Sequence, residues 1–212
     1  MDDTMDSNRH PVHHTQALER LKQGNVRFTS NVRSIESLGG KQQREALVGG
    51  QKPFAIVLSC SDSRAPSELL FDCGLGDLFV VRVAGNVVAP SIVGSVEFAA
   101  ATFGTELIVV MGHTRCGAVA ATVDALRSGR GAMSENVRDI VDRISPGVAE
   151  LVKGGENGEE VVVRAIRANV RVSANHLRHG SRVLEERIAA GRLAVVGAEY
   201  SLETGEVDFF DV

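Results

Sequence analysis

The chain of 212 residues has no tryptophan, few cysteines and no excess of positive charge. Its three cysteines, an odd number at scattered positions, argue against a disulfide framework and favour a reducing, cytoplasmic location. A net charge of -4 offers no basic surface for nucleic acid or an anionic membrane. No apolar run approaches the ~20 residues of a membrane-spanning helix. The polar start of the chain also lacks the features of a secretory signal.

The composition of the chain, with 43% hydrophobic and 24% charged residues, is typical of one soluble globular domain. Residues 1–14 are polar and rich in histidine, and we expect them to form a flexible tail. Apolar residues at helical spacing over 15–29, and more weakly over 35–48, predict an N-terminal helical arm that spans residues 15–50. Residues 51–212 would then form the core.

Four short runs rich in β-branched residues follow the arm: FAIVLS, DLFVVRV, ELIVVMG and LAVVGAEY. They are apolar on both faces, as expected of strands in a parallel sheet that helices cover on both sides. Helices are predicted over 91–104, 116–129, 134–152 and 159–180, and the ending VVGAEYSLETGEVDFF predicts a last strand at the sheet edge. The predicted fold class is therefore α/β: a single domain with a mostly parallel sheet of four to five strands, flanked by helices and preceded by the arm.

Two of the predicted strands end in residues that suit a metal site. The stretch SCSDSR closes the first run, so Cys60, Asp62 and Arg64 share one face of an extended segment. The stretch GHTRCG closes the third run and places His113 and Cys116 in the turn before a helix. Ligands bind beyond the carboxyl ends of the strands in open α/β sheets. Both motifs are therefore expected to project into the same place.

Cys60, His113 and Cys116 form a set of ligands that suits zinc, and three protein ligands leave the fourth tetrahedral position for water. Asp62 could fill that position and close the site, whereas Arg64 could grip the carboxylate and hold it off the metal. With the carboxylate held off, Asp62 would accept a hydrogen bond from zinc-bound hydroxide. Since two thiolates cancel the charge of the ion, activity is expected to rise on the alkaline side. The alternative for the three ligands is a structural zinc or a coincidence of the core.

The paired motifs resemble those of the β-class carbonic anhydrases, and the resemblance extends from about residue 16 to residue 200. It implies a zinc lyase, with one zinc ion per chain, that interconverts carbon dioxide and water with bicarbonate and a proton through zinc-bound hydroxide. It also implies a homodimer or tetramer whose active sites lie at the dimer interface. Residues 51–212 would be the zinc-binding catalytic core.

The resemblance further implies the residues of a substrate pocket. Gln51 matches the family's pocket glutamine, whose amide would hold an oxygen of the substrate, and Phe79 matches an apolar wall residue. Phe98 stands where many relatives have tyrosine, and Ala84 stands where they have valine. The cavity is therefore expected to be slightly roomier and less polar than in those relatives.

A subset of the family is closed by bicarbonate at a noncatalytic site that needs a tryptophan three residues before the first zinc cysteine. Val57 occupies that position here, although Arg82 and Tyr200 match the other two members of the site. This difference argues against the regulation and favours an open catalytic site.

Three functions are consistent with the predicted zinc site. The first is hydration of carbon dioxide, and the second is hydrolysis of carbonyl sulfide or carbon disulfide at the same zinc site, for which Ala84 and Phe98 leave room. The third is a catalytically silent zinc-binding or bicarbonate-sensing protein, against which Arg64 argues because a permanently closed site has no use for a competing cation. His176 and His179 lie one helical turn apart, but they have no third ligand and indicate a solvated helix face.

Overall fold

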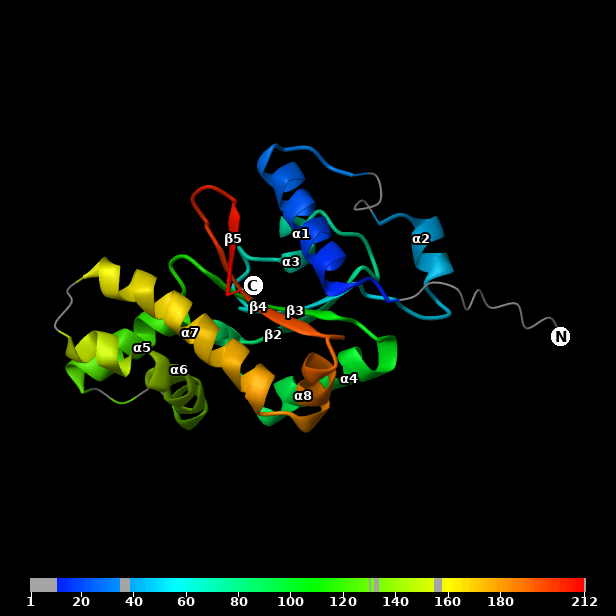
Figure 1. Ribbon diagram of the computed structural model, residues 1–212. Helices are drawn as coiled ribbons and strands as arrows, with labels where there is room; N and C mark the ends of the chain where they lie inside the picture. The colour runs from blue at the N-terminus through cyan, green and yellow to red at the C-terminus, as the bar shows by residue number, and fades with distance from the viewer. Residues whose placement is uncertain (1–10, 35–38, 130, 132–133, 155–157, 212) are drawn as a thin grey trace.

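Five strands form one sheet in the computed structural model, which describes residues 11–34, 39–129, 131, 134–154 and 158–211. The strands are β1 (Ala55–Ser59), β2 (Leu78–Arg82), β3 (Leu107–His113), β4 (Ala194–Tyr200) and β5 (Val207–Phe210). Their order across the sheet is β2-β1-β3-β4-β5 (Figure 1). The first four are parallel, and β5 pairs antiparallel with β4 at the edge. The predicted fold class, including the last strand at the sheet edge, is confirmed.

The helices of the described chain connect these strands. They are α1 (His14–Thr29), α2 (Lys41–Ala46), α3 (Ser67–Leu70), the short 3-10 helix η2 (Ala84–Asn86), α4 (Pro90–Phe103), α5 (Gly117–Ser128), α6 (Glu135–Lys153), α7 (Glu159–His179) and α8 (Arg182–Ala189). The four helices predicted in the core are all present, with ends that differ by one residue at most. The sequence did not predict α3, η2 or α8, and α2 is shorter than the predicted stretch 35–48, of which 35–38 lie outside the described residues. Within the described part of the chain, no helix has the length and apolarity to cross a membrane.

Local sequence signals explain where several of these helices begin and end. The Ser134 hydroxyl accepts a hydrogen bond from the amide of Val137 at the start of α6, and Ser181 caps α8 in the same way. Gly104 and Gly129 adopt left-handed conformations, with φ of 68° and 67°, directly after α4 and α5. Glycine adopts this conformation without the steric cost that a side chain brings, so both helices stop there.

Helices cover both faces of the sheet, which explains why the strands are apolar on both sides. On one face, residues of α1 and α3 pack on β1, β3 and β4, whereas α4, α7 and α8 cover the other face (Figure 1). Every residue of β1 and of β3 is buried. A third apolar cluster, formed mainly by α5, α6 and α7, adjoins the sheet and contains Cys60 and Cys116. The two motifs therefore end at the boundary between the sheet and this third cluster.

The N-terminal region lies against the sheet through α1. Ala17, Leu18 and Leu21 are buried in the core of that face, and Gly24 lies so close to Phe71 that a Cβ atom at this position would be 1.9 Å from the Phe71 carbonyl oxygen. By contrast, α2 has no buried residue. Most of the predicted tail, residues 1–10, lies outside the described residues, and the division into tail, arm and core stays a prediction.

Candidate metal centre

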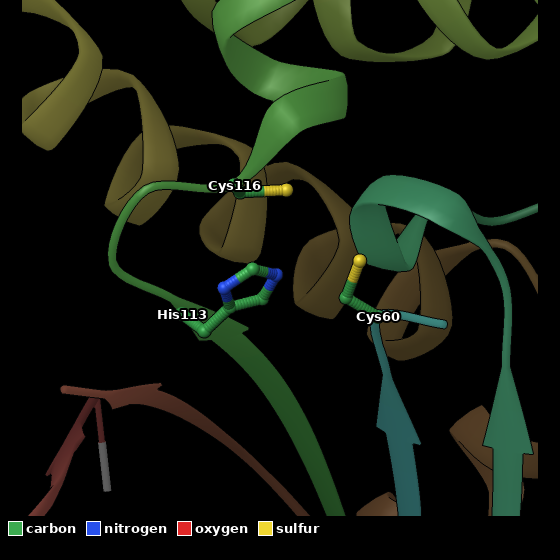
Figure 2. Close-up of side chains that lie close together, drawn as sticks. All are labelled: Cys60, His113 and Cys116. Carbon is green, nitrogen blue, oxygen red and sulfur yellow. The ribbon is translucent and has the colours of Figure 1, made fainter. Parts of the chain in front are cut away.

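Cys60, His113 and Cys116 come together at the carboxyl ends of two adjacent strands. Cys60 follows β1, His113 ends β3, and Cys116 precedes α5. Figure 2 shows their side chains pointing toward one common space, and their ligand atoms all lie within 4.8 Å of one another. The three residues are almost completely buried. The predicted proximity of the two motifs is confirmed.

The backbone around Cys60 is held by its neighbours on β2 and in η2. Arg82, the last residue of β2, donates hydrogen bonds to the carbonyl oxygens of Cys60 at 3.0 Å and of Asp62 at 2.6 Å. The amide of Gly85 donates to the Sγ atom of Cys60 at 3.3 Å. A guanidinium and a backbone amide thus fix both the carbonyl and the sulfur of this residue.

The two ring nitrogens of His113 have different surroundings. Its Nδ1 atom donates to the carbonyl oxygen of Thr114 at 2.9 Å, which leaves Nε2 as the unprotonated nitrogen of the neutral ring. Nε2 is buried and has no hydrogen-bond partner among the residues that the structure describes. A buried lone pair between two thiols is costly unless a cation or donor meets it. The donor set therefore fits a zinc ion held by two sulfurs and one nitrogen.

The two thiols influence each other. A hydrogen bond from Cys116 lowers the pKa of Cys60, and the same interaction, together with burial, raises the pKa of Cys116. In the absence of a metal, loss of a proton from one thiol therefore hinders loss of a proton from the other. Both become thiolates only when a cation compensates the second charge, so metal binding at this site should release protons.

Asp62 lies beside the three ligands and is gripped by Arg64. The backbone amide of Arg64 and its Nε atom both donate to Oδ1 at 2.9 Å, and its Nη2 atom donates to Oδ2 at 2.8 Å. The hydrogen bonds from Arg64 hold the pKa of the Asp62 carboxyl well below its usual range. Oδ2 also lies 3.9 Å from Nε2 of His113. The carboxylate is thus ionised, paired with a cation and close to the unpaired nitrogen.

The four predicted pocket residues do not gather at this centre within one chain. Ala84 opens η2 next to the Gly85 amide, and Phe79 lies on β2 with its ring 6.3 Å from the ring of Phe98. Phe98 is 53% exposed on α4. Gln51 precedes β1, at the end of the strand opposite to Cys60, and lines a separate cavity of about 540 Å³. Their role as a pocket stays a prediction.

Several residues with contacts around the centre were not singled out in the sequence. Gly85 was missed although Gly-Asn after a strand is a turn signal. Asn169 and Glu203 carry no such signal, and they act through distant partners, since Asn169 donates to the Gly85 carbonyl and Glu203 accepts from Thr114. His176 is exposed at the end of α7, as expected for a solvated helix face.

A buried group of two cysteines and one histidine beyond the carboxyl ends of parallel strands defines an α/β protein with a candidate metal centre. Residues 55–207 match the carbonic anhydrase family. The chain belongs to this family, in its β class. The general activity of the family is the hydration of carbon dioxide.

Relatives in sequence and in structure agree on this assignment. The carbonic anhydrase of Mycolicibacterium smegmatis is 40% identical over 192 residues, which cover 91% of each chain. Carbonic anhydrase 2 of Mycobacterium tuberculosis is 40% identical over 189 residues and 89% of each chain. Among solved structures, the β-carbonic anhydrase CcaA matches 93% of this chain and 86% of its own with a TM-score of 0.73 at 26% identity. One of two β-carbonic anhydrases from Sordaria macrospora, described as tetrameric, matches 80% of this chain and 86% of its own with a TM-score of 0.69 at 25% identity.

Proposed function

We propose that this protein catalyses the reversible hydration of carbon dioxide to bicarbonate and a proton, with one zinc ion per chain held by Cys60, His113 and Cys116. The observation that carries the proposal is the buried donor set with an ionised carboxylate beside it, in a chain of the carbonic anhydrase family. Zinc bound there would lower the pKa of a water in its remaining position and so supply a nucleophile near neutral pH.

Asp62 would orient that water by accepting a hydrogen bond from it. Its carboxylate is ionised, and Oδ2 lies on the side of the centre where His113 Nε2 has no partner among the described residues. Since Arg64 engages both carboxylate oxygens, Asp62 cannot turn toward the ligands without losing hydrogen bonds to a guanidinium. Arg64 would therefore keep Asp62 from becoming a fourth ligand, and the pair would be the catalytic dyad.

The substrate pocket would be completed by a second copy of the chain. Gln51, Phe79 and Phe98 lie toward the opposite end of the strands from Cys60, so they do not line the centre of their own chain. Phe98 presents an exposed aromatic ring on α4. A homodimer, alone or within a tetramer, would place these residues of one chain near the dyad of the other.

Carbonyl sulfide or carbon disulfide is the second candidate substrate, because both are linear and apolar like carbon dioxide. The small Ala84 next to the Cys60 loop and the aromatic cluster around Phe98 favour a pocket without extra polar groups. Turnover of both kinds of substrate by one preparation separates the two candidates. Negligible sulfide release with fast hydration would remove the second candidate.

The cytoplasmic location stays part of the proposal. It is supported by three cysteines that are all free thiols, two of which would be lost as ligands in an oxidising compartment. Fractionation of the producing cells, with an antibody to the full chain, tests it directly.

Stopped-flow hydration of carbon dioxide on protein of known zinc content tests the main proposal. We expect about one zinc per chain, and a rate that is higher at about pH 8.5 than at about pH 7 because the two thiolates make bound water less acidic. Full zinc content with no turnover at either pH would overturn the proposed activity while leaving the metal centre in place.

A further inference from the structure

Asn169 is a buried polar side chain on α7 that none of the roles described so far requires. It is 1% exposed, and its Nδ2 atom donates to the carbonyl oxygen of Gly85 at 2.7 Å. The amide of the same Gly85 donates to Sγ of Cys60 at 3.3 Å. Asn169 is therefore separated from a candidate metal ligand by a single residue of η2.

The turn between them is one that needs to be held in place. Gly85 has a φ of 69° and Asn86 has a φ of 44°, so two successive residues adopt left-handed conformations. A Cβ atom at Gly85 would lie 2.8 Å from Cδ1 of Ile144 and 3.1 Å from Cβ of Ala118. A side chain at this φ would be strained, and glycine is also the residue that most easily changes conformation. The direction of the amide that faces Cys60 thus depends on contacts made by the turn.

Stability alone is a poor reason for an asparagine at this position. Its Oδ1 atom is buried and has no hydrogen-bond partner in the described part of the chain. A buried unpaired amide oxygen destabilises the fold, and an apolar side chain of similar size would avoid that cost. The hydrogen bond from Asn169 to the Gly85 carbonyl oxygen is therefore the contact that explains an asparagine at this position.

We propose that Asn169 is a positioning residue of the metal centre: it holds η2 so that the Gly85 amide stays directed at the sulfur of Cys60. A thiolate that accepts this hydrogen bond has a fixed orientation and a reduced tendency to leave the metal. The inference rests on the proposed function, because it assumes that Cys60 binds zinc. It adds a residue of α7 to a centre whose ligands follow β1, end β3 and precede α5.

The test compares three variants of the full chain loaded with zinc or with cobalt. Asn169→Leu keeps the approximate volume and removes the donor, and Asn169→Ala removes it without risk of a clash. Ser173→Ala is the matched control, since Ser173 is buried one turn further along the same helix. The measurements are the rate of zinc transfer to a chromogenic chelator and the thiolate-to-metal absorption band of the cobalt protein.

We expect both Asn169 variants to release zinc about tenfold faster than the wild type and to show a shifted cobalt band, because loss of an outer hydrogen-bond partner typically weakens metal binding by this order. Ser173→Ala should match the wild type in both measurements. Wild-type release rates and spectra in the Asn169 variants would overturn the inference, even if their melting temperatures fell, and would leave the proposed function intact. A wild-type protein that binds neither metal would overturn both.

Discussion

Gln51 and Cys60 lie beyond opposite ends of β1, and this separation leads to a test of how the active site is assembled. The five residues of β1 alone account for roughly 17 Å between them at the usual rise per strand residue. A substrate molecule of three or four atoms cannot contact both in one chain. If Gln51 serves the site at all, it serves the site of a partner chain related by two-fold symmetry.

The perturbation is a mixed dimer, with Cys60→Ser in one chain and Gln51→Ala in the other. If Gln51 acts across the interface, one site loses both residues and the other site keeps both. The mixed dimer should then have about half the hydration rate of the wild-type dimer. If Gln51 acts within its own chain, the metal-loaded site lacks it, and the loss of one hydrogen bond lowers the rate of that site about tenfold, to about one twentieth of the wild-type dimer.

The assay uses two affinity tags, one on each chain, so that only mixed dimers survive two purification steps. Zinc content is measured first and should be about half that of the wild type, because only one chain has its full ligand set. Stopped-flow hydration then separates the two arrangements by about tenfold.

The matched control is a mixed dimer of Cys60→Ser with Cys116→Ser. Both changes remove ligands from the chain that carries them, so neither site is complete in either arrangement and the rate should be negligible. A rate of about one twentieth for the first mixed dimer would refute a shared site. A failure of the two tags to copurify would refute the dimer itself.

Further predictions concern the Asp62–Arg64 pair and two buried positions away from the metal centre. Arg64→Ala should keep its zinc yet lose at least about a hundredfold in hydration, since the carboxylate is no longer held in place; an unchanged rate at full zinc content would refute the role of Arg64 in the dyad. Because Arg64 holds the pKa of Asp62 below its usual range, the carboxylate stays ionised at neutral pH and its pairing is lost only in acid. Asp62→Asn should therefore lower the rate and, because it removes a negative charge beside the bound water, move the alkaline midpoint of the pH profile to lower pH. Burial raises the pKa of Cys73 to about 12, so mass spectrometry after alkylation near neutral pH should find it unmodified in the folded protein and modified after denaturation. Gly24→Ala should lower the free energy of unfolding by about 1–3 kcal/mol through its clash with the core, whereas Gly154→Ala, with its nearest atom at 3.5 Å, should have little effect in the same denaturation assay.

The ligand set could be predicted from the sequence because its geometry depends on short segments of chain. Cys60 directly follows a fully buried parallel strand, and His113 ends the neighbouring one. Parallel strands bring their carboxyl ends to one edge of the sheet regardless of how the helices pack. The same reasoning predicted the strands and the long helices, whereas α3, η2 and α8 were missed because short helices leave little periodic signal.

The outer contacts of the centre could not be predicted in this way, because they join residues that are far apart in sequence. Asn169 reaches a turn 84 residues away, and Thr114 donates to Glu203 89 residues further on. Whether these groups come into contact depends on how α7 and the β4–β5 hairpin pack against the rest of the fold. Their positions are determined by packing across the whole core. A relative could therefore keep every ligand and still differ at Asn169. Such a chain would have the same metal chemistry, but we expect it to hold its zinc less tightly because the turn that contains Gly85 would lack this hydrogen bond.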